Sequence, residues 1–301
     1  MTYPHPDPAT AAPRARRRAL ALPDPRPLLL SALLALALVA SLALPGRAAS
    51  REEVRDFLKV TGFDAAIDSI SLSADRGPAM LGLDDPGFVT VWNVMAKRVF
   101  DRATMQDMAA AMLEETLDEA AIRSAHDFYG SDLGQRLVEV ENASHLDEDE
   151  GRADLASALL AHLIEERDVA RLSALDRLVS ALDDTSDGVM AMAEVQSRFM
   201  IAARNAGVIE LRVGDDALRD LIAEQFRQMQ ADSGSQDGVA NAAWTYRDFT
   251  TEEIDRYAEA LEDPGMQRVY ELMNAVQYEV MADRFETAAS LLVGAQPSQE
   301  L

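Results

Sequence analysis

The sequence predicts an all-α fold made of two related helical units joined by a long connector helix. The stretch Ile122–Asn142 recurs 132 positions later as Ile254–Asn274, with an isoleucine, a Gln-Arg pair and an asparagine at identical spacing. Elsewhere, apolar residues recur at the period of amphipathic helices. Only Val208–Val213 alternates like a strand, and a lone strand has no pairing partner. We therefore expect helices throughout.

The second copy predicts a helix, a tight break and another helix. Thr250 and Glu253 have capping-box spacing, in which a hydroxyl and a carboxylate satisfy free backbone N–H groups. Apolar positions then share one helical face: Ile254, Tyr257, Ala258 and Leu261. Asp263 followed by Pro264 ends this helix and starts the next, because aspartate caps a helix and proline suits its first turn.

The first copy predicts the same break with different residues. Its helical face carries Ile122, Ala125, His126 and Tyr129. Gly130 is expected to adopt the left-handed conformation that often ends a helix, and Ser131 to cap the next helix. Ser131 and Asp263 thus occupy equivalent positions, which supports the repeat.

The motif around this break resembles a known family. Phe128-Tyr129, a small residue, and Gly134-Gln135-Arg136 at a helix start are similar to the hallmark of the prokaryotic domain of unknown function number 2059. The second copy has Ala260-Leu261 in place of Phe-Tyr, and its glycine lies one position early, at Gly265. The resemblance implies an exported helical bacterial domain without an assigned activity.

Residues 1–48 have the parts of a secretory signal peptide. Arginines cluster at positions 14–18, an uncharged run covers Leu28–Leu44, and Gly46-Arg47-Ala48 fits a small-x-small cleavage site. The predicted location is the periplasm. The alternative is an uncleaved N-terminal anchor, because 17 apolar residues reach the lower end of the membrane-spanning range.

Composition limits the classes of function. The formal net charge is −24, and removing residues 1–48 leaves 22 basic and 50 acidic residues, a net charge of −28. Such a chain repels phosphate backbones, so we expect no nucleic-acid partner, and contact with a membrane only through an uncleaved N-terminal segment. The absence of cysteine excludes a thiol nucleophile, a lipoprotein anchor and iron–sulfur ligands.

The domain organisation follows from these signals. We expect a first helical unit at residues 49–149 and a second at 184–293, followed by a disordered tail at 294–301. Residues 150–183 would be the connector helix, because Arg152–Leu182 contains neither glycine nor proline.

The sequence offers little catalytic chemistry. His126, His145 and His162 lack the spacing of a helical metal-binding pair, and no phosphate-binding loop or nucleophile elbow occurs. We expect no cofactor, metal or catalytic residue. The motif residues are interpreted as structural, with an anion-binding polar pocket at the break as the alternative: Tyr129, Ser131, Gln135, Arg136, Asp263, Gln267 and Arg268.

The predicted function is that of an exported, non-catalytic protein acting through contacts with an unidentified protein or through envelope maintenance. The oligomeric state is left open. The alternative is a hydrolase-like enzyme or a small-ligand-binding protein with its site between the two halves. A buried polar cluster drawn from both halves would favour the alternative, whereas an apolar surface groove would favour an interaction protein.

The signal segment generates a first prediction. The mature chain should begin at Ala49 or Ser50, because the small-x-small site precedes these residues. N-terminal sequencing of the exported protein tests this. Recovery of an intact 28–44 segment in the membrane fraction would refute it.

Overall fold

The computed structural model describes residues 49–147, 151–182, 185–233 and 236–292. The predicted signal peptide and the predicted tail therefore lie outside the described residues. The described chain is helical and contains no strand, which confirms the all-α fold class. Val208–Val213, the one alternating stretch, forms a non-helical connection. Within the described ranges, no helix is both long enough and apolar enough to span a membrane.

The first half consists of short helices, most of them capped by an acidic or hydroxyl side chain. Ser50 forms a complete capping box with Glu53, and Asp85, Asp101 and Asp118 each accept a backbone N–H bond at a helix start. The elements are α2 (Arg51–Thr61), α3 (Phe63–Ser73), the 3-10 turn η1 (Ala74–Arg76), α4 (Gly77–Met80), α5 (Pro86–Val99), α6 (Arg102–Thr116), α7 (Glu119–Tyr129) and α8 (Asp132–His145).

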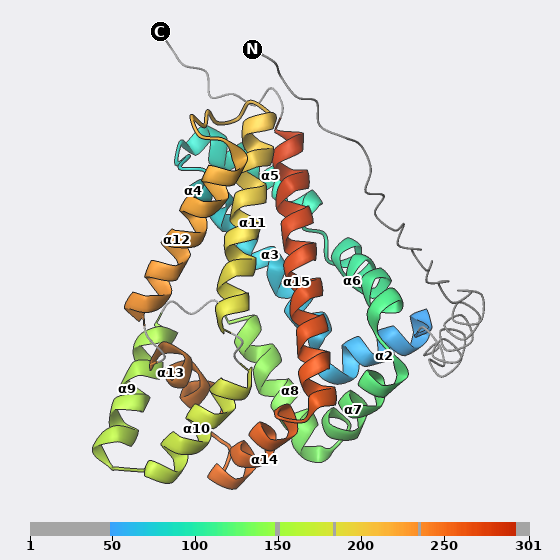
Figure 1. Cartoon of the computed structure of the whole chain (residues 1–301), viewed down its shortest axis with the longest axis vertical. Coiled ribbons are helices and arrows are strands. Elements are labelled where there is room, and N and C mark those ends of the chain that lie inside the picture. Colours follow the sequence, from blue (N-terminus) through green and yellow to red (C-terminus); the bar gives the residue numbers. More distant parts are fainter. Residues whose placement is uncertain (1–48, 148–150, 183–184, 234–235, 293–301) are drawn as a thin grey trace, which may run out of the picture. The chain divides into compact units, whose positions relative to one another are not determined.

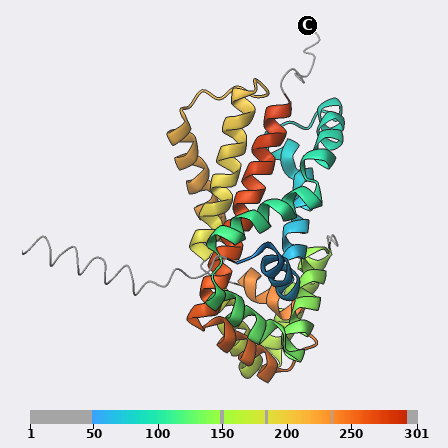
Figure 2. The same cartoon turned by 90° about the vertical axis from the view of Figure 1, so that its right-hand side faces the viewer.

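The second half contains the longest helices. Its elements are α9 (Arg152–Glu165), α10 (Val169–Leu182), α11 (Thr185–Asn205), α12 (Asp215–Ser233), α13 (Gln236–Thr245), α14 (Thr251–Leu261) and α15 (Pro264–Leu291). In Figure 1, α15 and α11 run side by side, and α12 covers the other side of α11. The turned view in Figure 2 shows the same arrangement.

Helix α15 is the element on which both halves pack. It contacts α3, α5, α6 and α7 of the first half, and α11 and α14 of the second. Its 28 residues bury apolar side chains along their whole length, from Met266 to Ala289. A second group forms where α9 packs on α13, and α10 packs on α13 and α14.

An aromatic cluster joins the halves at one level of α15. Trp92 of α5, Phe199 of α11 and Phe285 of α15 are each at most 1% exposed, and their ring centroids lie 5.0–6.4 Å apart. The Trp92 indole donates a 2.8 Å hydrogen bond to the carbonyl of Ala74, which satisfies its buried N–H group.

The connector is not one long helix, which corrects the sequence prediction. The chain turns between α9 and α10, where Arg167 adopts a left-handed φ of 57° and the Asp168 carboxylate accepts the Arg171 N–H group at the start of α10. The turn lets α9 pack on α13 while α10 packs on α14. An arginine replaces the usual glycine here, so a rule based on glycine and proline misses the break.

The packing around Trp92 generates a prediction. A Cβ atom at Gly77 would collide with the six-membered ring of Trp92, whereas one at Gly214 meets nothing within 4 Å. Gly77→Ala should therefore destabilise the protein by about 1–3 kcal/mol, the usual cost of overpacking. Thermal unfolding with Gly214→Ala as the control measures this. Equal melting temperatures for the two variants would contradict the described packing.

Candidate functional site

A buried polar cluster lies where the two halves meet. It consists of the Glu141 carboxyl group and four tyrosines, which we call the tyrosine cluster: Tyr129, Tyr246, Tyr257 and Tyr270. The hydroxyl groups of Tyr257 and Tyr246 donate to Glu141 Oε1 at 2.7 and 2.8 Å. Glu141 and Tyr129 come from α8 and α7, while the other three tyrosines come from the second half.

The remaining hydroxyl groups form a chain that leads to the carboxyl group. Tyr129 lies 2.5 Å from Tyr270 and 3.1 Å from Tyr257, and Tyr270 lies 2.8 Å from Tyr257, measured between hydroxyl oxygens. Because the Tyr257 proton is used on Glu141, Tyr257 accepts from one of its neighbours. A carboxylate is thus the final acceptor of a connected network.

Two opposing effects act on Glu141. Burial raises the pKa of its carboxyl group above the ordinary 4.5, and the hydrogen bonds from Tyr257 and Tyr246 oppose this by stabilising the charged form. Burial wins, so the pKa is raised. Burial also raises the pKa values of the tyrosines, so their hydroxyl groups stay protonated as donors.

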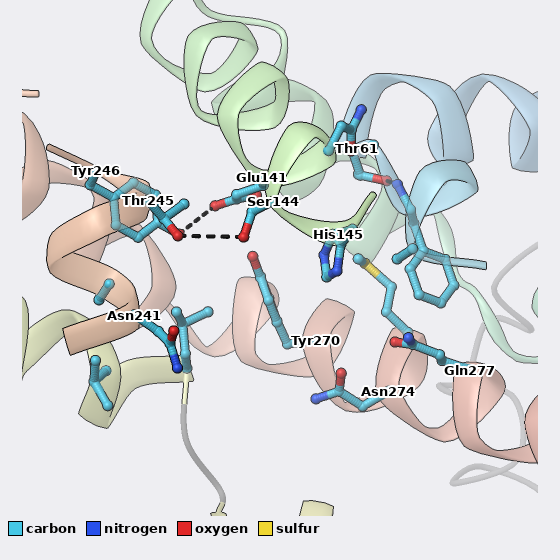
Figure 3. Close-up of a pocket in the computed structure, with 18 of the residues that line it drawn as sticks. Thr61, Glu141, Ser144, His145, Asn241, Thr245, Tyr246, Tyr270, Asn274 and Gln277 are labelled. Carbon is cyan, nitrogen blue, oxygen red and sulfur yellow. Dashed lines mark hydrogen bonds between the residues drawn. The ribbon is translucent and has the colours of Figure 1, made fainter. Parts of the chain in front are cut away.

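A pocket of about 450 Å³ opens beside this cluster, and Glu141, Tyr246 and Tyr270 belong to its wall (Figure 3). Its lining comes from both halves: the first half contributes the α2–α3 junction and α8, and the second contributes the start of α9 together with α10, α13 and α15. Such a volume lies in the range of small-molecule sites, roughly 300–1,000 Å³.

The pocket wall has a polar part and an apolar part. Four side-chain amides line the polar part, together with hydroxyl groups and one imidazole: Asn142, Asn241, Asn274, Gln277, Ser144, Thr245 and His145. The apolar part is formed by Phe63, Ala66, Val179, Leu182, Ala242 and Met273. A mixed wall of this kind suits an organic ligand with a polar end.

Two pairs of residues that lie 132 positions apart line this pocket. Asn142 and Asn274, which end the two repeated stretches, both line it. His145 and Gln277, also 132 positions apart, do the same. The pocket wall thus draws on both α8 and α15.

The hydroxyl groups of the pocket are not arranged as a nucleophile and its base. Arg152 donates to the Ser144 carbonyl at 2.8 Å and to its hydroxyl oxygen at 2.6 Å. The Ser144 hydroxyl otherwise lies 3.5 Å from that of Thr245. Burial and the Arg152 charge lower the pKa of His145. Among the described residues, no group of three or more His, Cys, Asp or Glu side chains could hold a metal ion.

The first-copy motif residues border the tyrosine cluster. Tyr129 is 1% exposed and belongs to that cluster. Gln135 donates from Nε2 to the Tyr129 carbonyl at 2.5 Å and to the Val60 carbonyl at 3.2 Å. Arg136 donates to Glu253 at 2.7 Å. Ser131 caps α8 by accepting the Gly134 N–H group.

The second-copy motif residues make different contacts. Asp263 caps α15 by accepting the N–H groups of Gly265 and Met266. Gln267 is exposed and borders a neighbouring hollow with Tyr270, and its side chain makes no hydrogen bond within the described part of the chain. Arg268 pairs with Glu271 on its own helix. The two Gln-Arg pairs are therefore not equivalent in their contacts.

The glycines at the first break correct one expectation. Gly130 has a φ of −72°, so it is not in the left-handed conformation. The steric requirement falls on Gly134, where a Cβ atom would collide with the Phe128 carbonyl oxygen. The motif needs a glycine at position 134 because the first turn of α8 touches the end of α7.

Sequence reasoning missed most residues of this site. No motif or spacing in the sequence indicated that four of them belong to a site: Glu141, Tyr246, Tyr270 and Arg152. The asparagine that ends each repeated stretch was the one sequence feature that leads to the pocket. An expectation that repeated polar positions share a site would have pointed to Asn142 and Asn274.

One comparison with known proteins finds a family that matches part of the chain. Residues 103–161 match the family described as "Uncharacterized protein conserved in bacteria (DUF2059)". The match spans α6, α7, α8 and most of α9, and it confirms the resemblance inferred from the motif at residues 128–136. No curated protein and no solved structure matches the chain.

The raised pKa of Glu141 gives a pH prediction. A carboxyl group whose folded-state pKa exceeds its unfolded value contributes stability below the unfolded pKa, and this stability is lost as the pH rises through the folded pKa. The melting temperature of the wild type, relative to Glu141→Gln, should therefore fall as the pH rises above about 4.5.

Calorimetry of both proteins from pH 4 to pH 8 measures this difference. Glu139→Gln, an exposed position on the same helix, serves as the control. The prediction is contradicted if the melting temperature of the wild type rises with pH relative to that of Glu141→Gln. That result would show that the folded protein holds the carboxylate in preference to the acid.

Proposed function

We propose that this is an exported, non-catalytic protein that binds a small ligand in the pocket between its two halves. The observation that carries the proposal is the polar cluster drawn from both halves, which opens into that pocket. Buried polar side chains are costly unless they are satisfied, so a cluster held beside an open space favours a binding role.

The geometry favours binding over catalysis. The pocket serine is hydrogen-bonded to Arg152, and the carboxyl group at the inner wall accepts bonds from tyrosines that burial keeps protonated. A hydrolase needs a nucleophile within hydrogen-bond reach of a base. Export to the periplasm, supported by the signal-like features of residues 1–48, places such a binding protein where it meets extracellular small molecules.

We also propose that the two halves descend from one helical unit. Helices α7 and α14 begin 132 positions apart, as do α8 and α15, and so do their N-caps Ser131 and Asp263. The equivalent pairs in the pocket wall give further support. A site built from corresponding turns of two related units is a natural product of duplication.

A second candidate function is contact with another protein through α12. In the described structure, α12 packs mainly on α11. Leu221 and Met229, two turns apart on its outer side, are 64% and 50% exposed. Exposed apolar side chains on one helix favour a docking surface, although a few such residues occur on most proteins.

The ligand-binding proposal predicts a saturable site for a neutral apolar probe. N-phenyl-1-naphthylamine should bind the purified protein with one-site stoichiometry and enhanced fluorescence. Asn241→Trp should abolish this, because a large side chain at this exposed rim position would fill the pocket. Fluorescence titration measures the binding.

Asn205→Trp is the matched control, since Asn205 is an exposed helix-end position away from the pocket. Thermal unfolding and circular dichroism establish that each variant is folded. Equal probe binding by Asn241→Trp and the wild type would contradict the proposed site.

A further inference from the structure

We infer that the ligand is a zwitterion with an apolar side chain, that is, an apolar amino acid or a short peptide. The inference rests on the proposed binding pocket and concerns what that pocket recognises. The observation behind it is that the pocket wall carries one carboxyl group and one guanidinium group, Glu141 and Arg152, together with side-chain amides and apolar side chains.

Glu141 supplies an acceptor for an ammonium group. Both tyrosine bonds reach the same oxygen, Oε1. In the described structure, Oε2 accepts no hydrogen bond, and it is not among the fully buried polar atoms without a partner. This oxygen is therefore available to a donor in the pocket. An ammonium group provides up to three N–H donors and the opposite charge.

Arg152 supplies donors for a carboxylate. A guanidinium group has five N–H donors. Two hydrogen bonds join Arg152 to Ser144, and within the described ranges Arg152 forms no ion pair with an acidic side chain. Its donors that have no partner among the described residues match the planar geometry of a carboxylate.

The two charged groups lie beside the same stretch of α8. Arg152 is bonded to Ser144, and Ser144 lies three residues after Glu141 on α8. Side chains at this spacing are neighbours on a helix. A single small molecule that carries two charges can therefore reach both groups.

The charge balance favours a zwitterion over a simple ion. An anionic ligand would bring negative charge to Glu141, and a cationic ligand would bring positive charge to Arg152. His145 adds no charge near neutral pH, because burial and Arg152 lower its pKa below the ordinary 6.5. A molecule with both charges pairs each group and leaves neither unpaired.

The rest of the wall suits a peptide with an apolar side chain. Side-chain amides offer both donors and acceptors, which a peptide group needs. Asn142 of α8 belongs to the wall, and Figure 3 shows Asn274 with Gln277 one turn further along α15. Phe63, Leu182 and Met273 form part of the apolar wall that would receive the side chain.

The test compares zwitterions with analogues that lack one charge. Isothermal titration calorimetry of the wild type should detect one-to-one binding of leucine or leucyl-leucine. N-acetyl-leucyl-leucine and leucyl-leucine amide should bind about 10- to 100-fold more weakly, because each lacks one charge-assisted hydrogen-bonding group. The relative affinities of leucine and leucyl-leucine show which of the two is preferred.

Variants assign each charge to its partner. Glu141→Gln should lose the preference for the free ammonium group, and Arg152→Gln should lose the preference for the free carboxylate. Arg177→Gln, which breaks an exposed ion pair with Glu262, should keep both preferences. If a pocket variant does not fold, the analogue series on the wild type decides the question.

The outcomes separate this inference from the proposed function. Equal binding of the zwitterions and their blocked analogues would overturn the zwitterion assignment while leaving the pocket intact. The same holds if the neutral probe binds and no zwitterion displaces it. If neither the probe nor a zwitterion binds, the pocket proposal fails as well.

Discussion

The packing of the two halves against each other depends on the hydrogen bonds between Glu141 and the tyrosine hydroxyl groups. A half-buried carboxyl group is tolerated because two hydroxyl groups from residues more than 100 positions away donate to it. Those two hydroxyl groups come from the turn after α13 and from helix α14, and Tyr270 of α15 joins the network through Tyr257. The network therefore fixes the position of α8 relative to the second half and, with it, one wall of the pocket.

Local chemistry explains which parts of the fold were predictable. N-caps depend on a few neighbouring residues, so the starts of α8 and α15 follow directly from Ser131 and from Asp263 with Pro264. The break between α9 and α10 does not, because Arg167 adopts a conformation that its own side chain disfavours and that helix packing imposes. Gly130 and Gly134 illustrate the same limit: the sequence shows two glycines near a turn, but only the packed structure shows that the second one makes the close contact.

The site was less predictable than the fold because it is made of long-range contacts. Tyr129 and Tyr257 lie on apolar helical faces, where a tyrosine is expected to pack, and nothing in the sequence names the partner of its hydroxyl group. Glu141 resembles any other glutamate on an amphipathic helix. The asparagines at positions 142 and 274 were the exception, since both line the pocket. The Gln-Arg pairs recur as faithfully but make different contacts, so recurrence alone does not establish a shared role.

These features together describe a helical protein whose two halves enclose a polar pocket. The central claim is that this pocket holds a small molecule, and a crystal structure of the purified protein with N-phenyl-1-naphthylamine tests it most directly. The account predicts electron density for the probe between α8, α13 and α15, in contact with the apolar wall and beside Tyr270. Density for the probe only at another surface, with side chains closing the pocket, would contradict it.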